Sequence, residues 1–132
     1  MVLGHGIDIV QNKRIADMLD EHGERFITRC FTDRERDYAE SSPDRRIERY
    51  AARFAVKEAV FKALGTGWRS GLSWTDMEVC RDPLGRPVLQ LSGGCAEEAR
   101  KRSMSQWSIS LSHTSDCSVG SAIATGSCED SS

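Results

Sequence analysis

The stretch FAVKEAVFKALGTG, residues 54–67, belongs to a long helical segment that decides the fold of this chain. The start of the helix is marked by Ser42, a preferred capping residue, and by Pro43, which suits the first helical position. Gly65 is a typical C-terminal stop, so the helix is expected to end at Leu64. The sequence therefore predicts one long main helix between two clear breaks.

Two charged residues lie beside the apolar side of this helix. Glu58 and Lys62 are one turn apart, and the simpler interpretation is an ion pair on the helix surface. Because the pair shares a face with apolar side chains, it should be partly shielded from water. A shielded carboxylate beside an ammonium suits a hard cation together with a phosphate. Both interpretations stay open at this point. The apolar stripe consists of Ile47, Ala51, Phe54 and Phe61.

Outward from the helix, the N-terminal segment 2–10 has the alternation of a β-strand. Ile7 and Ile9 point to one side of this strand and Asp8 to the other. An acid among apolar strand residues must be solvated, hydrogen-bonded to backbone or bound to a cation. Helices are expected next over 12–22, with Asn12 as the cap, over 25–31, and from a capping box at 32–35 through residue 38.

The second half of the chain has the alternation and the turns of β-structure. Helices thus precede a mainly antiparallel sheet that the N-terminal strand joins, and the fold class is α+β. No linker divides the chain, so residues 1–126 are expected to form a single domain and residues 127–132 a disordered tail. Strands are expected over 75–81, 86–91, 107–111 and around Val119, with a turn at 82–85 and a helix over 94–102.

Composition excludes several classes of protein. The chain has 132 residues with a net charge of −2, which gives no basic surface of the size that duplex nucleic acid requires. No apolar run approaches the ~20 residues of a membrane span. Five cysteines without paired metal-ligand spacing or a secretion signal favour reduced thiols and a cytoplasmic location. A domain of this size has little room for a deep cleft, so a site shared between subunits is expected.

Other polar positions could bind an anion. The glycines around Thr66 let a ligand approach the backbone, and Arg53 could reach a phosphate. A solvated helix arginine is an equally good interpretation of Arg53. His113 stands between two hydroxyl residues, which suits either a phosphate site or a histidine satisfied within a turn.

Together these pieces resemble a known pattern. GID at 6–8, followed after a long gap by FAVKEAVFK at 54–62, is similar to the signature of the 4'-phosphopantetheinyl transferases. Further segments resemble the small holo-acyl-carrier-protein synthase subclass of that family, and the likeness extends from Gly6 to about Ala124. These segments are LGTG at 64–67, WTDMEV at 74–79, GRP at 85–87 and WSISLSH at 107–113.

The resemblance implies the phosphopantetheinyl transferase fold, assembled as a homotrimer with sites at the subunit interfaces. Asp8 and Glu58 would hold Mg²⁺ together with water and the pyrophosphate of coenzyme A, and Lys62 would neutralise that pyrophosphate. The resemblance assigns further positions to coenzyme A: Arg53, Gly65, Thr66 and His113, with Ser112 and Thr114 as weaker candidates.

The implied reaction moves the phosphopantetheine arm of coenzyme A to a serine of an acyl carrier protein and releases 3',5'-ADP. Either Glu58 or a metal-bound water that Glu58 orients would take the serine proton. An acidic carrier could meet Arg14, Met18 and Arg25, although acidic residues are interspersed among them. The sequence does not choose between carriers of fatty-acid, polyketide and peptide synthesis.

Two other functions use the same residues differently. A metal-dependent nucleotide phosphohydrolase would employ Asp8, Glu58 and Lys62 without a protein acceptor. A non-catalytic binding module would have Glu58 and Lys62 as a structural ion pair. The intact two-part signature argues against both.

Overall fold

The computed structural model describes residues 1–67, 69 and 71–127, and its α+β architecture confirms the expected fold class. No helix within these residues is long and apolar enough to cross a membrane. The elements are β1 (Val2–Gln11), α1 (Asn12–His22), α2 (Glu24–Cys30), α3 (Asp33–Glu40), η1 (Pro43–Arg45), α4 (Arg46–Leu64), η2 (Trp74–Asp76), β2 (Met77–Arg81), β3 (Pro87–Leu91), α5 (Gly93–Lys101), β4 (Gln106–His113) and β5 (Cys117–Thr125).

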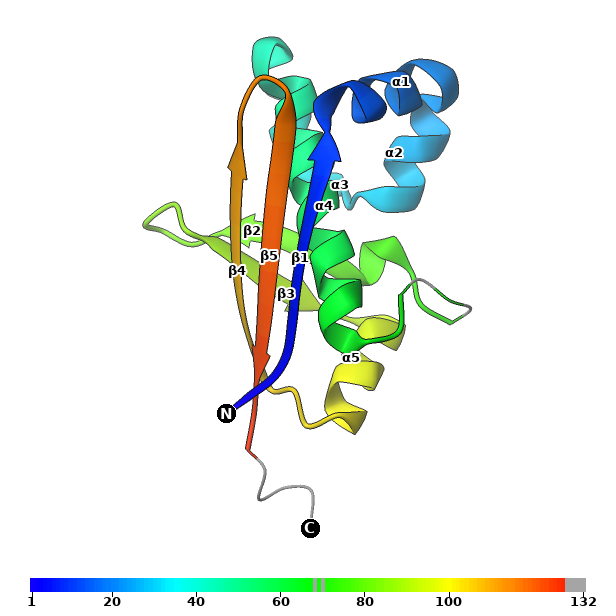
Figure 1. Cartoon of the computed structure of the whole chain (residues 1–132). Coiled ribbons are helices and arrows are strands. Elements are labelled where there is room, and N and C mark those ends of the chain that lie inside the picture. Colours follow the sequence, from blue (N-terminus) through cyan, green and yellow to red (C-terminus); the bar gives the residue numbers. More distant parts are fainter. Residues whose placement is uncertain (68, 70, 128–132) are drawn as a thin grey trace.

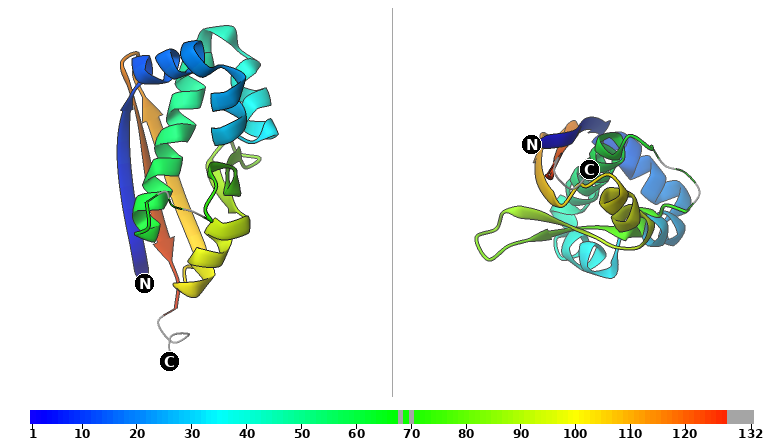
Figure 2. Two further views of the ribbon diagram at one scale, coloured as in Figure 1. Left: turned by 90° about the vertical axis from the view of Figure 1, so that its right-hand side faces the viewer. Right: turned by 90° about the horizontal axis from the view of Figure 1, so that it is seen from below.

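Helix α4 forms the middle layer of the molecule. Figure 2 shows the helix with the sheet on one side and the other helices and the β2–β3 hairpin on the other. From Tyr50 to Leu64 nearly all of its residues are buried. Ala51, Phe54 and Phe61 of the expected apolar stripe are buried, but Ile47, which was also placed in it, is 38% exposed, and the buried surface is wider than one stripe. A helix covered on two faces needs apolar residues on most of its circumference.

The main sheet is antiparallel with strand order β1-β5-β4, and it packs very closely on α4 (Figure 1). A Cβ atom added to Gly6 would come within 1.9 Å of the Ala59 carbonyl oxygen, and one added to Gly120 within 2.3 Å of the Val56 nitrogen. Only residues without a side chain fit such contacts. This close approach brings the inward side of β1 directly against α4.

The other face of this sheet carries apolar side chains that no element among the described residues covers. Ile7 is 56% exposed, Ile9 65% and Ile123 37%. In the strand register Ile9 pairs with Val119 and His5 with Ile123, so these side chains lie on one face. The expectation that Ile7 and Ile9 point away from Asp8 agrees with this arrangement.

Strands β2 and β3 form a hairpin of their own, separate from the three-stranded sheet. The sequence suggested one sheet, because alternation gives the period of a strand but not its partner. Met77 and Val79 of β2 are buried in the core with Val56 and Phe61 of α4. The hairpin therefore covers the second side of α4 and does not extend the sheet.

Two local expectations on the first helices had different outcomes. The capping box of α3 is confirmed, with Thr32 and Glu35 bonding reciprocally. Asn12 does not cap α1. It is the first helical residue, and its buried amide donates to the carbonyls of Thr114 and Ser115 at 2.9 and 3.2 Å. Asn12 thereby joins α1 to the turn between β4 and β5. Of the expected tail 127–132, all but Ser127 lies outside the described residues.

Candidate active site

Asp8 and Lys62 form an ion pair between β1 and α4. Asp8 shares the inward side of β1 with the buried residues Gly6 and Val10. Lys62 Nζ donates to Asp8 Oδ1 at 2.9 Å and to the Ile7 carbonyl oxygen at 2.9 Å. Within the described residues the ion pair of Lys62 is thus with Asp8, and the pairing one turn away with Glu58 is not formed.

Glu58 is half-buried beside this pair. Burial raises the pKa of the Glu58 carboxyl, and the negative charge of Asp8 raises it further, while Arg14 and Lys62 act in the opposite direction. The two carboxylates are therefore close enough to repel each other, although Asp8 and Glu58 are fifty residues apart in sequence. An ionised Glu58 is stable in this half-buried position only when positive charge lies nearby.

The two carboxylates fit a magnesium ion. Magnesium commonly takes one or two protein carboxylates and completes its shell with water and substrate phosphate. No cluster of three or more His, Cys, Asp or Glu side chains suited to a metal occurs in residues 1–67, 69 and 71–127. A donor set of Asp8 and Glu58 would leave most coordination places to water and substrate, as magnesium prefers.

Glu58 opens into a cavity of about 490 Å³ on the side of α1 and α2, called the Glu58 cavity below. Its basic and apolar walls include all three residues that the sequence assigned to a protein partner, Arg14, Met18 and Arg25. The Arg14 guanidinium lies 5.6 Å from the centre of the Phe54 ring, which stacks on Trp74 at 4.9 Å. Positive charge and apolar surface therefore meet next to the carboxylate of Glu58.

A second cavity, called the arginine cavity below, lies by α3, β2 and β4 and has a volume of about 80 Å³. Arg53 and His113 both line it, so the structure brings these two predicted residues together. Arg53 is only 3% exposed, and its Nε atom has no hydrogen-bond partner among the described residues. Burial lowers the pKa of Arg53. A buried donor without a partner is suited to a ligand oxygen.

Sequence reasoning missed three residues of the arginine cavity. The guanidinium groups of Arg49, Arg53 and Arg81 lie 4.1, 4.3 and 5.1 Å from the centre of the Tyr38 ring. Arg49 is one turn before Arg53, and this spacing was a usable signal. Tyr38 and Arg81 gave no local signal, because only the packing of α3 and β2 brings them here. His113 Nδ1 lies 3.3 Å from Glu48 Oε2.

The remaining predicted positions do not gather at one place. His113 shares its strand face with the inward Leu111, so Ser112 points to the outer face of the sheet. The hydroxyl oxygen Oγ1 of Thr114 accepts hydrogen bonds from the Asp116 and Cys117 backbone amides, both at 3.1 Å, so this side chain is bound within the β4–β5 turn. Gly65 ends α4 in the left-handed conformation, and the buried Thr66 Oγ1 has no partner in the described part of the chain.

A larger cavity, of about 600 Å³ between β3, α5 and β4, contains none of the predicted site residues. Its walls are mainly apolar, and its arginine, Arg100, is exposed and paired with Glu97 of the same helix. Nothing in this cavity offers the paired carboxylates and the lysine that lie at Asp8, Glu58 and Lys62. The candidate active site is therefore the group of Asp8, Glu58 and Lys62 with the adjoining Glu58 cavity.

Comparisons with known proteins identify the family of the chain. The 4'-phosphopantetheinyl transferase superfamily matches residues 4–125. A holo-[acyl-carrier-protein] synthase of Desulforudis audaxviator is 47% identical over 131 residues, covering 98% of this chain and 97% of the relative. The crystal structure of the holo-[acyl-carrier-protein] synthase from Neisseria meningitidis superposes with a TM-score of 0.86 at 30% identity, covering 95% of this chain and 99% of that one.

A further structure, that of a holo-(acyl-carrier-protein) synthase from Bacillus anthracis, was solved in complex with CoA (3',5'-ADP). It superposes with a TM-score of 0.80 at 35% identity and covers 96% of this chain and 99% of that one. The family thus matches almost the whole chain, and both the sequence and the fold are similar to those of these synthases. This chain belongs to the 4'-phosphopantetheinyl transferase superfamily, alongside its holo-[acyl-carrier-protein] synthases.

Proposed function

We propose that this chain is a holo-[acyl-carrier-protein] synthase that transfers the 4'-phosphopantetheine group of coenzyme A to a serine of an apo acyl carrier protein. The observation that carries the proposal is the Asp8–Lys62 ion pair beside Glu58, whose side chain lines a cavity with basic and apolar walls. The names of the related proteins and the coenzyme A complex of the Bacillus anthracis synthase support the same reaction.

The reaction joins the serine oxygen to the β-phosphorus of coenzyme A and breaks the bond from that phosphorus to the oxygen that leaves with 3',5'-ADP. Asp8 and Glu58 would hold magnesium, which when bound supplies positive charge against the phosphate oxygens. Lys62 adds a second positive charge from the same place. The Lys62 side chain is 54% exposed, so its ammonium can bind a phosphate oxygen while it keeps its bond to Asp8.

Glu58 is the proposed acceptor of the serine proton. Without a bound cation, burial and Asp8 raise the pKa of Glu58, which makes its carboxylate a stronger base than an ordinary glutamate, whereas a bound cation would act in the opposite direction. The carboxylate also faces the cavity through which a carrier serine would approach. Proton transfer through one water that Glu58 orients would use the same side chain.

The carrier is proposed to dock over the Glu58 cavity. Arg14 and Arg25 line this cavity and suit an acidic protein surface, and Met18 offers an adaptable apolar contact between them. Such a dock places the acceptor serine beside Glu58. The carrier chemistry that fits is thus an acidic helix surface with an apolar centre.

We propose a homotrimer with sites shared between subunits. In one protomer the Glu58 cavity and the arginine cavity have no lining residue in common, and they lie on different sides of the buried helix α4. One coenzyme A could contact both sets of residues more easily if a neighbouring subunit supplied the second. The uncovered apolar face with Ile7, Ile9 and Ile123 is a suitable contact surface between subunits. The cytoplasmic location stays a prediction.

The function is tested by the mass of an apo acyl carrier protein incubated with the purified chain, coenzyme A and magnesium. The expected result is a gain of one phosphopantetheine arm, lost when a chelator is added. Carriers from fatty-acid, polyketide and peptide synthesis are compared in parallel. Release of 3',5'-ADP or phosphate without any modified carrier would instead favour a phosphohydrolase. No change in any component would refute the transferase and leave a binding module.

A further inference from the structure

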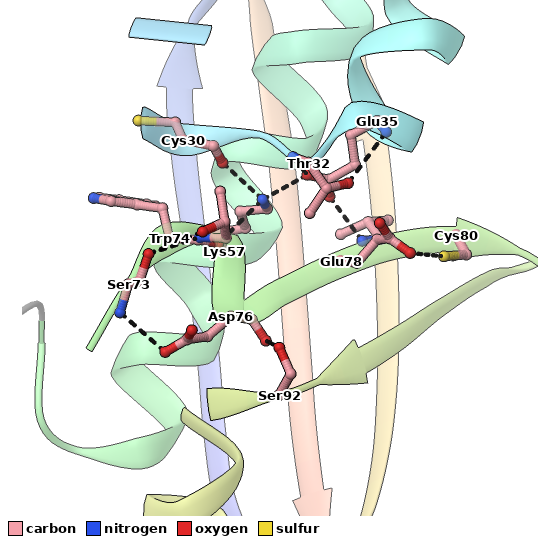
Figure 3. A network of polar contacts seen from close by, with 12 residues as sticks. Cys30, Thr32, Glu35, Lys57, Ser73, Trp74, Asp76, Glu78, Cys80 and Ser92 are labelled. Atoms are coloured by element: carbon pink, nitrogen blue, oxygen red, sulfur yellow. Dashed lines mark hydrogen bonds and ion pairs between the residues drawn. The ribbon is translucent and has the colours of Figure 1, made fainter. Parts of the chain in front are cut away.

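Lys57, the residue before Glu58, is completely buried and takes part in no step of the proposed reaction. Its ammonium donates to the Cys30 carbonyl oxygen at 2.7 Å, to Glu35 Oε1 at 2.6 Å and to the Trp74 carbonyl oxygen at 3.2 Å. An ammonium has three protons, so these bonds use its full donor capacity. Figure 3 shows these bonds converging on Lys57 from Cys30 at the end of α2, from Glu35 of α3 and from Trp74 of η2.

The counter-ion is satisfied as completely as the lysine. Glu35 is also fully buried, and its Oε1 atom accepts from the Thr32 amide at 2.9 Å as well as from Lys57. Its Oε2 atom accepts from the Val79 amide at 2.7 Å (Figure 3). A buried ion pair seldom adds much stability compared with apolar side chains of similar size, because desolvation opposes the attraction. Stability alone therefore does not explain why Lys57 and Glu35 are buried as an ion pair.

The position of the acceptors supplies a further reason. Cys30 at the end of α2 and Trp74 in η2 both line the Glu58 cavity, and both offer their carbonyl oxygens to the same ammonium. These two walls are separated by more than forty residues of chain. The residue that joins them is covalently next to Glu58, so the spacing between the walls and the carboxylate depends on Lys57.

We propose that Lys57 is a positioning residue that holds the α2 and η2 walls of the Glu58 cavity at the spacing that an acyl carrier protein requires. The inference rests on the proposed function of this cavity. Loss of Lys57 should therefore weaken binding of the carrier, because the Cys30 and Trp74 walls belong to the cavity over which the carrier is proposed to dock. Coenzyme A contacts proposed at Lys62 and Arg53 are not tied to these walls.

The test uses two variants that separate wall positioning from stability. In Lys57→Met/Glu35→Gln both buried charges are removed together, which favours retention of the fold, but the bonds to Cys30 and Trp74 are lost. In Glu35→Gln the counter-ion is lost while Lys57 can still donate to both carbonyl oxygens. Tyr50→Phe removes the buried bond from Tyr50 to Glu40, away from the cavity, and serves as the control for general destabilisation.

The measurements are the KM values for carrier and for coenzyme A, kcat, and amide hydrogen exchange of segments 24–30 and 72–77. For Lys57→Met/Glu35→Gln we expect the KM for carrier to rise at least ~10-fold while the KM for coenzyme A stays within ~3-fold. Hydrogen exchange should become faster in both segments. Glu35→Gln and Tyr50→Phe should keep the KM for carrier even where the melting temperature falls.

An unchanged KM for carrier in the folded double variant would overturn the inference and leave the proposed function intact. A rise that follows the melting temperature across all three variants would overturn it too, because a merely structural role predicts that. If the wild-type chain modifies no carrier, the proposed function fails. Hydrogen exchange then decides alone: faster exchange of both walls in the double variant than in Glu35→Gln supports the role of Lys57, and equal exchange refutes it.

Discussion

Glu58 illustrates at the scale of one residue how the needs of stability and of chemistry conflict. Its pKa is raised in the folded chain by burial and by Asp8. The folded state therefore binds a proton more readily than the unfolded state does. Stability contributed by this group is greatest in acid and falls as the pH rises from about 4.3 through the raised pKa. At neutral pH the ionised Glu58 is a cost to the fold that the proposed chemistry explains.

Glu58→Gln should consequently reduce activity and increase stability at the same time. The amide keeps the shape of the side chain but can neither hold a cation as a carboxylate does nor accept the serine proton, so we expect a rate loss of ~10²-fold or more. The melting temperature at pH 7 should be equal to or above that of the wild type. Carrier mass spectrometry and thermal unfolding measure the two effects. Glu21→Gln, at an exposed carboxylate, should change neither.

Arg14 provides a separate test through the pH dependence of the rate. Its positive charge lowers the pKa of Glu58, against the effects of burial and Asp8. Arg14→Gln should therefore raise that pKa and move the acid limb of kcat to higher pH, measured at saturating carrier and coenzyme A. Lys13→Gln changes the neighbouring charge on α1, which is paired with Asp17 on the surface, and should leave the limb in place. A limb unmoved by Arg14→Gln would contradict the role of Glu58 as the titrating base.

At the scale of elements, local chemistry predicted where α4 ends but not what surrounds it. Gly65 stops the helix as its left-handed backbone requires, and the start at Ser42–Pro43 is displaced only by the 3₁₀ turn of η1. The number of covered faces depends on the whole fold, so the sequence placed Ala51, Phe54 and Phe61 correctly in the buried surface but not Ile47, and it did not predict that this surface extends around most of the helix. The same limit applies to the β2–β3 hairpin, whose alternation was visible but whose partner was not.

The candidate site could be predicted only in part, because local sequence patterns do not give the contacts between distant elements. The signature residues Asp8, Glu58 and Lys62 could be selected from the sequence, because charged residues within an apolar strand or beside an apolar helix stripe are unusual and match the two-part family signature. Their contacts could not, since Lys62 bonds to Asp8 across two elements and not to Glu58 one turn away. The contribution of Tyr38 to the arginine cavity depends on long-range packing, which has no local trace in the sequence.

The contact between β1 and α4 makes the site sensitive to one methyl group. Gly6→Ala would place a Cβ atom 1.9 Å from the Ala59 carbonyl oxygen, so β1 must move away from α4 and carry Asp8 with it. We expect destabilisation of roughly 1–3 kcal/mol, typical of overpacking, and a loss of activity beyond that of the unfolded fraction. Chemical denaturation and carrier assays measure the two. Gln11→Ala, exposed at the end of the same strand, is the control and should have little effect.

For the whole molecule the decisive feature is the division of the proposed coenzyme A contacts between two cavities on different sides of α4. If each site combines the Glu58 cavity of one subunit with the arginine cavity of its neighbour, two inactive variants should rescue each other. Glu58→Gln damages one half of the site. Arg53→Met damages the other, while it keeps an apolar chain against Tyr38 in place of the guanidinium.

Co-expression of these variants with different affinity tags gives mixed assemblies. In a trimer that contains both variants, one of the three interfaces joins an intact Glu58 half to an intact Arg53 half, so the activity of the assemblies purified through both tags should approach about a third of wild type. Each variant alone should be nearly inactive. Sites confined to single subunits would instead give a mixture no more active than its components. The mass in solution, measured by light scattering, connects this outcome with the exposed face of Ile7, Ile9 and Ile123, because rescue requires that the subunits associate.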